Sequence, residues 1–119
     1  MIVVLSLKSN FNPMQNDTVL AFRMQLNKGN EAEYKKRHDE IWPELAELLK
    51  NAGIQEYYIF LDEVTLALFA FQKLSPDAET SGLSSLPIMK KWWDHMADLM
   101  EVNPDNSPKV VACPEVFRL

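Results

Sequence analysis

The stretch from Thr65 to Gln72 is apolar on both faces of the strand that its composition predicts. Successive side chains of a strand point to opposite sides of the sheet. One face carries Leu66, Leu68 and Ala70, and the other carries Ala67, Phe69 and Phe71. A strand of this kind has to be covered on both sides. Any fold of this chain therefore has to bury both faces of a sheet at that strand.

Two earlier stretches have the alternating pattern of strands. Thr18 to Leu26 carries one apolar face, which consists of Leu20, Phe22, Met24 and Leu26. Ile54 to Leu61 also alternates, with Ile54, Glu56, Tyr58 and Phe60 on one face and Gln55, Tyr57, Ile59 and Leu61 on the other. We therefore expect both stretches in the same sheet as the strand at 65–72.

The remaining strand signals concern a hairpin and the C-terminal part of the chain. A turn at Asp62-Glu63 predicts a hairpin between the strands at 54–61 and 65–72. Residues Val110 to Phe117 are expected to form the last strand. Pro114 makes that strand an edge strand or marks a bulge, because proline donates no ladder hydrogen bond.

A long helix is expected from about residue 31 to 51, beginning after Asn30 and ending near Gly53. Pro43 interrupts it, because proline has no N–H for the carbonyl of Asp39 and its ring crowds that carbonyl. Pro43 either kinks the helix or opens a second helix as its first-turn residue. The sequence leaves both possibilities open.

A second helical region follows Ser75. Ser81-Gly82 and Pro87 divide it, so we expect a short helix at about 76–84 and a longer one at about 87–100. The apolar residues of the longer helix have a three–four spacing, which predicts that this face packs in the core. They are Met89, Trp92, Trp93, Met96, Leu99 and Met100.

The order of the elements is strand, helix, strand, strand, helix, strand, which predicts an α+β, ferredoxin-like βαββαβ subunit. Right-handed crossovers put both helices on one face of a four-stranded antiparallel sheet and leave the other face open. The strand at 65–72 makes that open face apolar. A second copy packed sheet on sheet is the economical cover, so we predict a homodimer, in the form of a dimeric α/β-barrel.

Residues 1–17 are expected to be an N-terminal extension outside this domain at 18–119. The extension is rich in loop formers after Leu7, and Val3 to Leu7 is a candidate edge strand. Its apolar start lacks a basic lead-in and a convincing cleavage site, so a signal peptide is not expected.

Composition excludes several classes of function. The 119 residues make one domain, and the net charge of -5 with scattered Lys and Arg leaves no footprint for nucleic acid. No apolar run approaches the roughly 20 residues of a membrane span, so no membrane partner is expected. The one cysteine, Cys113, forms no internal disulfide, which fits a reducing cytoplasm. Two histidines and one cysteine provide no Cys/His spacing for zinc, and no metal is predicted.

The helical stretch around His38 combines an apolar face with one titrating group. Tyr34, His38, Ile41 and Leu45 share one helical face, whereas the opposite side, which includes Arg37, is predicted to be solvated. An imidazole that exchanges protons near neutral pH and points inward beside a tyrosine is a candidate catalytic acid or base. A buried histidine satisfied by a backbone carbonyl is the competing interpretation, and the pattern alone favours neither.

Two aromatic pairs are candidate ligand contacts. Trp92 and Trp93 point about 100° apart on a helix, so we expect one to pack in the core and the other to line a cavity or an interface. Indole faces stack on sugars, although packing of both rings in the core is the alternative. Tyr57 and Tyr58 point to opposite faces of their strand, so one faces the helices and the other faces away.

The other polar features are weaker candidates. The loop from Asn103 to Pro108 either hydrogen-bonds a ligand or only turns the chain, and His95 is expected on the solvated side of its helix. The sequence contains no Gly-rich phosphate loop, no Ser-His-Asp ordering and no carboxylate cluster suited to a metal. An inward histidine with tyrosines and tryptophans suits proton transfer on an uncharged, hydroxyl-rich ligand without a cofactor.

Several motifs over residues 18–118 resemble the L-rhamnose mutarotase family. In chain order they are Ala21-Phe22-x-Met24-Gln25, Tyr34-x-x-Arg37-His38-x-x-Ile41-Trp42-Pro43-Glu44-Leu45, Tyr57-x-Ile59-x-Leu61-Asp62, Trp92-Trp93-x-x-Met96, Asn103-Pro-Asp-Asn-Ser-Pro108 and Glu115-Val-Phe117. The resemblance implies a cofactor-independent isomerase that interconverts the α and β anomers of L-rhamnose, and a dimer of ferredoxin-like subunits.

The resemblance also implies roles for single residues. His38 falls on the family's proton-donating histidine, and its sugar-binding residues fall on Tyr34, Tyr57, Trp92 and Trp93. In such a reaction the ring oxygen gains a proton while the anomeric hydroxyl loses one. The ring opens to the aldehyde and recloses on the other face. Residues 1–17 and 75–87 show no family signature.

Two other functions are compatible with the residue pattern. One is a dimeric α/β-barrel monooxygenase that binds haem or forms quinones, with His38 as ligand or base. The other is a ligand-binding module without turnover. Anomer exchange in freshly dissolved L-rhamnose separates a mutarotase from both.

Overall fold

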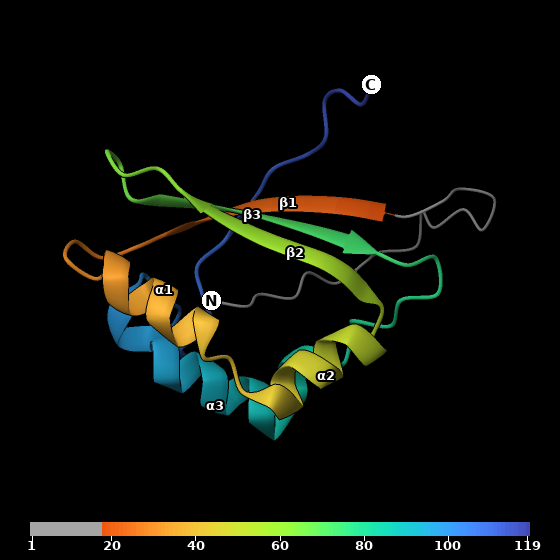
Figure 1. The fold of residues 1–119 in the computed structure, drawn as a ribbon, viewed down its shortest axis with the longest axis horizontal. Coiled ribbons are helices and arrows are strands. Elements are labelled where there is room, and N and C mark those ends of the chain that lie inside the picture. The colour runs from red at the N-terminus through yellow and green to blue at the C-terminus, as the bar shows by residue number, and fades with distance from the viewer. Residues whose placement is uncertain (1–17) are drawn as a thin grey trace.

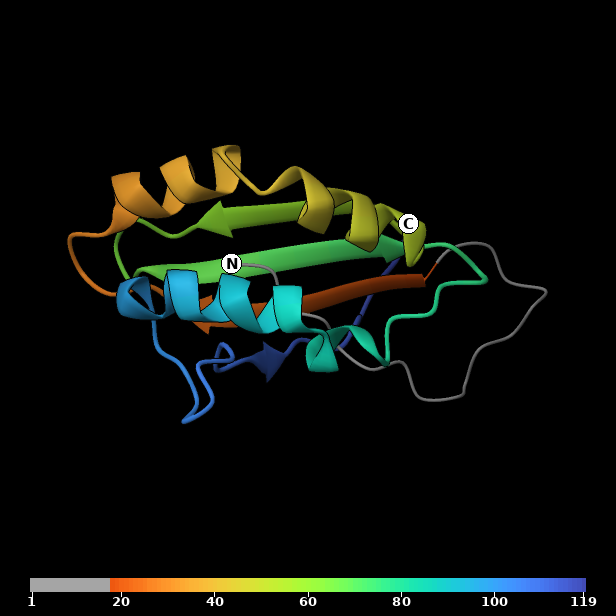
Figure 2. The same cartoon turned by 90° about the horizontal axis from the view of Figure 1, so that it is seen from below.

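The computed structural model describes residues 18–119, and all helices of this part lie on one face of a single sheet (Figures 1 and 2). The elements in chain order are β1 (Thr18–Gln25), α1 (Glu31–Asp39), α2 (Pro43–Asn51), β2 (Ile54–Leu61), β3 (Ala67–Leu74), the 3₁₀ turn η1 (Leu83–Ser85), α3 (Pro87–Met96), the 3₁₀ turn η2 (Ala97–Leu99) and β4 (Val111–Ala112). The predicted extension at 1–17, with its candidate strand at Val3 to Leu7, lies outside the described residues.

The sheet has four strands in the order β2-β3-β1-β4, and all pairs of neighbours are antiparallel. The two strands of the β2–β3 hairpin lie side by side, and β1 lies between β3 and β4. Two crossovers with helices on the same face connect β1 to β2 and β3 to β4 (Figure 1). The predicted ferredoxin-like α+β architecture is confirmed.

The core lies between the sheet and the helices. β1 contributes Phe22, Met24 and, just past its end, Leu26, all of which the alternating pattern predicts to be inward. The predicted apolar face of the last helical region is also buried in full, at Met89, Trp92, Trp93, Met96, Leu99 and Met100. Within residues 18–119, no helix is long and apolar enough to cross a membrane.

The first helical region is two helices, and Pro43 opens the second one. The backbone at Trp42 is extended, with φ −60° and ψ 129°, and Pro43 follows in the first turn of α2. The missing N–H of a first-turn proline costs nothing, because helix N-termini have no partner for that group. α1 buries Tyr34, whereas α2 buries Leu45 and Leu49. α1 therefore has a small apolar anchor of its own.

β2 (Ile54–Leu61) has the predicted bounds, but Ile54 lies on the opposite face of the sheet from the one that the alternation predicts. The register between β2 and β3 shifts between Ile54 and Glu56, which marks a β-bulge. An extra residue reverses the alternation locally, so Ile54 points into the core and is 6% exposed. Beyond the bulge the prediction is confirmed, because Tyr57 is half-buried toward the helices and Tyr58 is exposed on the other face.

β3 begins at Ala67, two residues later than predicted. The carboxylate of Asp62 accepts the N–H groups of Val64 and Thr65, which closes a turn. Leu66 has a φ of 63°, so the chain leaves the turn through a left-handed residue and cannot be a strand there. The two apolar faces of the strand are confirmed: Leu68 and Ala70 face the helices, and Phe69 and Phe71 face away.

The predicted helix at 76–84 is wrong. Only η1 is helical there, and α3 ends at Met96 before η2. The backbone of the segment bonds to the turn between α2 and β2, because Ser75 N–H donates to Gly53 O and Glu79 N–H donates to Ala52 O. The segment from Ser75 to Glu79 therefore follows the turn between α2 and β2 and does not coil into a helix.

The last strand is also shorter than predicted. β4 pairs with β1 only at Val111 and Ala112, and the final ladder bond runs from Cys113 N–H to Ala21 O. Pro114 follows and donates no hydrogen bond, so pairing ends. The predicted edge position of this strand is confirmed by the strand order.

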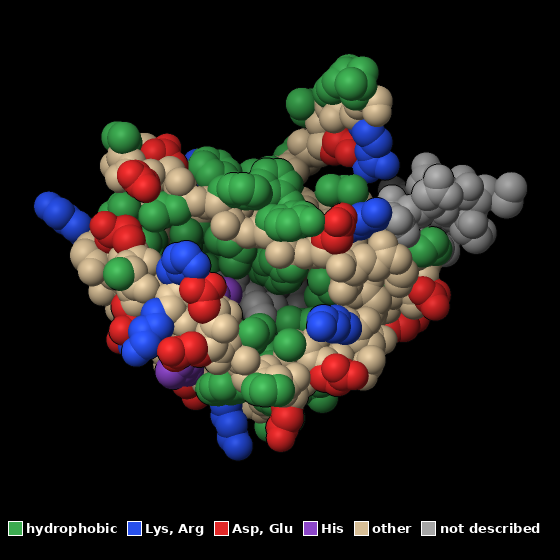
Figure 3. All heavy atoms as spheres, in the orientation of Figure 1, with side chains coloured by type: hydrophobic (Ala, Val, Ile, Leu, Met, Phe, Trp, Pro, Cys, Tyr) green, Lys and Arg blue, Asp and Glu red, His purple; other side chains and the backbone are tan. Residues whose placement is uncertain are grey.

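The second face of the sheet is apolar and carries no helix from residues 18–119. We call this face the open face (Figures 1 and 3). Its exposed large apolar side chains come from four strands: Val19, Tyr58, Phe60, Phe69, Phe71 and Val111. The rings of Phe60 and Phe71 pack edge to face with centroids 5.8 Å apart.

Candidate active site

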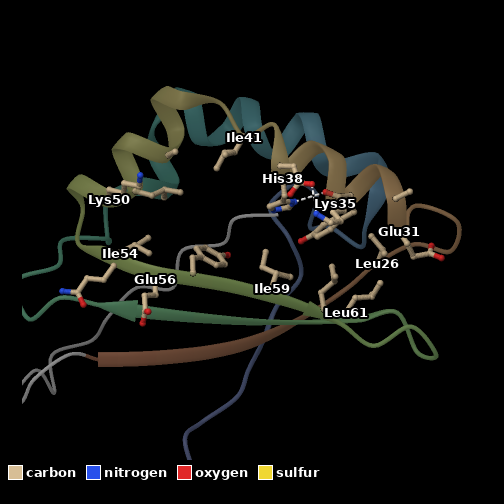
Figure 4. A pocket seen from close by; sticks show the side chains of 18 residues that line it. Leu26, Glu31, Lys35, His38, Ile41, Lys50, Ile54, Glu56, Ile59 and Leu61 are labelled. Carbon is tan, nitrogen blue, oxygen red and sulfur yellow. Dashed lines mark hydrogen bonds and ion pairs between the residues drawn. The ribbon is translucent and has the colours of Figure 1, made fainter.

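A pocket of about 740 Å³ lies between the inner face of β2 and the helices α1 and α2 (Figures 3 and 4). Its walls are mainly apolar, and charged side chains of both signs surround them. The lining residues are Leu26, Glu31, Ala32, Tyr34, Lys35, His38, Asp39, Ile41, Ala46, Leu49, Lys50, Ile54, Gln55, Glu56, Tyr57, Ile59, Leu61 and Leu68. The size suits a small molecule such as a monosaccharide.

His38 lies in the last turn of α1 and projects into this pocket (Figure 4). Its Nδ1 is 3.1 Å from the carbonyl oxygen of Tyr34, one turn earlier. A carbonyl oxygen only accepts hydrogen bonds, so Nδ1 is the nitrogen that carries hydrogen in the neutral ring. Nε2 is then the nitrogen without hydrogen in the neutral ring. The backbone of α1 therefore selects the tautomer of the imidazole.

Tyr34 and Tyr57 line the same pocket from opposite sides. The Tyr34 ring lies against the His38 ring with centroids 4.5 Å apart and is itself buried. Tyr57 comes from β2 and contacts Phe22 edge to face at 6.4 Å. The structure thus brings together three of the five predicted site residues: one titrating ring and two phenols.

Trp92 and Trp93 do not line this pocket. Trp92 is fully buried behind His38, and the two rings meet edge to face with centroids 5.7 Å apart. Trp93 is buried in the core. The implied contact of these tryptophans with sugar stays a prediction.

Sequence reasoning missed Arg37, which it placed on the solvated side of its helix. The Arg37 side chain is only 20% exposed. Its Nη1 donates to Asp98 at 2.9 Å and to the carbonyl of His95, and its Nε donates to Glu33 at 2.9 Å. Asp98 lies 61 residues further along the chain, so no local pattern signals this contact.

Trp42 was also missed as a neighbour of the site. Its ring packs edge to face on Trp92 at 5.1 Å and lies against the exposed ring of His95 at 5.6 Å. The extended backbone ahead of Pro43 turns Trp42 toward α3. The Trp42-Pro43 pair in the sequence signals a helix start, but it does not indicate which ring Trp42 contacts.

The loop from Asn103 to Pro108 uses its polar groups within itself and on α3. Asn103 Nδ2 donates to Ser107 Oγ at 3.0 Å, and Asn106 Nδ2 donates to the Asp94 carboxylate at 2.9 Å. Hydrogen bonds from Ser107 lower the pKa of Asp105. None of these residues lines the pocket. Of the two interpretations, turning the chain is the one that these contacts support.

The arrangement is suited to acid–base chemistry on a small neutral ligand. The pocket offers an imidazole with a defined tautomer, phenol groups on two walls, and apolar surface between them. In the part of the chain from 18 to 119, no cluster of three or more His, Cys, Asp or Glu side chains is suited to a metal ion.

Comparisons with known proteins agree on one family. A family model described as L-rhamnose mutarotase matches residues 19–119. An L-rhamnose mutarotase from Formosa agariphila is 57% identical over 98 residues, which are 82% of this chain and 94% of the relative. One from Flavobacterium johnsoniae is 57% identical over 106 residues, or 89% of this chain and 99% of the relative.

A solved structure is similar as well. The crystal structure of an L-rhamnose mutarotase from Formosa agariphila superposes with a TM-score of 0.79 at 56% sequence identity. The match covers 86% of this chain and 98% of that chain. The similarity therefore extends over nearly the whole of the solved protein.

Proposed function

This chain belongs to the L-rhamnose mutarotase family and is an isomerase of L-rhamnose anomers, and we propose that it acts through His38 as the proton donor. The single observation that carries the proposal for His38 is the hydrogen bond between its Nδ1 and the Tyr34 carbonyl in the pocket wall. That bond places the hydrogen of the neutral ring on Nδ1, and Nε2 is therefore the nitrogen that we propose exchanges a proton with a ligand.

The proposed reaction starts with His38 as an imidazolium. Nε2 gives its proton to the ring oxygen of the sugar while the anomeric hydroxyl loses its proton to a base or to water. The bond between C1 and the ring oxygen breaks, and the open-chain aldehyde forms. Rotation about the C1–C2 bond and reclosure, with return of the proton to His38, produce the other anomer. General acid–base help of this kind is worth about 10²–10⁴-fold.

The pocket walls support the choice of substrate. We propose that the hydroxyls of Tyr34 and Tyr57 bind sugar hydroxyls from two sides, because both residues line the pocket. C6 of L-rhamnose is a methyl group, and the apolar residues Ile54, Ile59 and Leu61 on β2 are suited to contact it.

Fewer observations support the proposed sugar-binding role of Trp92 and Trp93 than that of Tyr34 and Tyr57. Trp92 contacts the His38 ring, and its buried indole N–H finds no hydrogen-bond acceptor among residues 18–119. A buried donor of this kind is costly unless it is paired, and a sugar hydroxyl is a suitable acceptor. For Trp93 the support is the motif match alone.

Anomer exchange tests the proposed activity directly. Purified protein added to freshly dissolved L-rhamnose should accelerate the approach of the optical rotation to equilibrium, and saturation transfer between the two anomeric protons should increase. The heat-unfolded protein serves as the control. An exchange rate equal to that of the buffer would refute the proposed activity.

We further propose a homodimer in which two open faces pack together. The exposed aromatic rings of β2 and β3 support it, because soluble monomers rarely expose large apolar patches. A cytoplasmic location is also proposed. Its support is the single cysteine, which needs no oxidising compartment.

A further inference from the structure

α1 carries the proposed proton donor on a weak apolar anchor. Tyr34 is the one buried residue of this nine-residue helix. The chain leaves helical geometry after Asp39 and regains it only at Pro43. The position of the last turn of α1 therefore depends on contacts other than core packing.

Two consecutive residues of that turn contact the same neighbouring element. His38 meets the ring of Trp92 on α3, and Arg37 donates to the carbonyl of His95 and to the carboxylate of Asp98. Trp92, His95 and Asp98 follow one another at intervals of three residues, so they lie along one side of α3 and η2.

The Arg37 side chain makes four hydrogen bonds, to α1, α3 and η2, which we call the clamp. Its Nη1 and Nη2 reach the two oxygens of Asp98 at 2.9 and 3.5 Å, and its Nε reaches back to Glu33 on α1 at 2.9 Å. The His95 carbonyl lies in the last turn of α3, where carbonyl groups lack helical partners and cations are favoured. A planar guanidinium can make all of these bonds at once, whereas a lysine cannot.

We infer that Arg37 is a positioning residue for the proton transfer: it locks the last turn of α1 to α3 and η2 and thereby fixes the His38 ring against Trp92. The inference rests on the proposed role of His38. Arg37 does not line the pocket, so it acts through its neighbour rather than on the sugar.

Kinetic constants of three variants test this inference. Arg37→Gln breaks the clamp, Arg37→Lys keeps the charge without the fork, and Asp98→Asn weakens the clamp from the side of η2. Lys36→Gln is the matched control, because it removes the same charge from the neighbouring exposed residue. Misplacement of a catalytic group costs turnover, so kcat of Arg37→Gln should fall about tenfold with KM nearly unchanged.

The kcat values of Arg37→Lys and Asp98→Asn should lie between those of Arg37→Gln and the wild type. Arg37→Lys and Asp98→Asn should each lose part of kcat, and Lys36→Gln should keep it. Far-UV circular dichroism should be the same for all four proteins. The inference is overturned if Arg37→Gln and Lys36→Gln have the same kcat, or if Arg37→Gln raises KM alone.

A spectroscopic readout separates this inference from the proposed activity. In the wild-type protein, NMR should show a nuclear Overhauser effect between the His38 imidazole and the Trp92 indole. Arg37→Gln should weaken it, and Lys36→Gln should not. If wild-type protein fails to exchange anomers, the proposed activity is wrong; if the His38–Trp92 contact survives in Arg37→Gln, the positioning role is wrong.

Discussion

The Tyr34 carbonyl and the Trp92 ring constrain the His38 imidazole in different ways. The carbonyl accepts the Nδ1 hydrogen bond and selects the tautomer, whereas the indole packs against the ring and restricts its plane. Neither contact uses a charged side chain. The two contacts together fix the orientation of the ring in the wall of the pocket.

The ion pair that joins α1 to η2 predicts a pH-dependent stability. The hydrogen bond from Arg37 lowers the pKa of Asp98 below its ordinary value of 3.8. A lowered folded-state pKa favours folding above the ordinary value, and that contribution disappears as the pH falls through the folded-state pKa. The melting temperature of Asp98→Asn should therefore be lower than that of the wild type near neutral pH.

The difference should vanish at pH values well below 3.8, where Asp98 is protonated in both states. Because the Asp98 side chain is 67% exposed, the loss should be about 0–1 kcal/mol. A gap between the two melting temperatures that is the same at acidic and neutral pH would contradict this account.

The residues that sequence patterns predict at the site are those whose position depends on local periodicity. Tyr34 and His38 are four residues apart on one helix, and Tyr57 follows from strand alternation. Arg37 and Trp42 were not predicted as partners of α3, because their contacts join segments far apart in the sequence. Periodicity predicts which side of an element is inward, but it does not predict which side chains meet there.

At the scale of elements, the turn from α2 into β2 fixes the far end of the pocket. Gly53 makes this turn with a φ of 104°, and its carbonyl accepts the N–H of Ser75. The β-bulge that follows brings Ile54 into the pocket wall. The close approach of the segment after β3 to Gly53 is also why that segment forms no helix.

Three alanine substitutions test this account of the turn. A methyl group on Gly53 would lie 2.6 Å from Cβ of Ala78 and 2.7 Å from Oγ of Ser75, in addition to the strain of the positive φ. Gly53→Ala should therefore cost about 2–4 kcal/mol in chemical denaturation.

The other two glycines are graded controls for the same measurement. Gly29 has a φ of 90° but open space, so Gly29→Ala should cost about 1–2 kcal/mol. Gly82→Ala has neither problem and should change stability by about 0.5 kcal/mol or less. Equal losses for Gly53→Ala and Gly29→Ala would show that the contact with Ala78 has no effect.

The element boundaries show where sequence patterns stop being informative. Pro43 is compatible with a kink and with a new helix, because both accommodate a residue that has no N–H. The extended backbone of Trp42 shows that a new helix begins there. The Ile54 bulge and the left-handed Leu66 carry no glycine or proline to mark them. Both are set by how the hairpin pairs, which is a property of two strands together.

For the molecule as a whole, the open face relates the apolar pattern of β3 to the proposed homodimer. Phe69 and Phe71 are 37% and 39% exposed on the side of the sheet without helices, and Phe60 is 58% exposed beside them. The sequence pattern of β3 predicted an apolar open face, and the structure confirms that face. The second copy that covers it stays a prediction.

A charged substitution on the open face tests the dimer. Multi-angle light scattering should report twice the subunit mass for the wild-type protein, and Phe60→Asp should shift it toward the monomer, because burying a carboxylate between two sheets is costly. Val64→Asp is the matched control, since Val64 is 92% exposed in the β2–β3 turn. A wild-type monomer at micromolar concentration would refute the dimer, and a dimeric Phe60→Asp would refute this interface.

Chemical rescue tests whether His38 donates the proton that opens the sugar ring. Saturation-transfer NMR would follow L-rhamnose anomer exchange with the wild-type protein and with His38→Ala, each with and without added imidazole. We expect His38→Ala to lose about 10²-fold or more of the exchange rate and to recover part of it with imidazole, because the small acid fits the vacated space. An equal exchange rate for His38→Ala and the wild-type protein would contradict it.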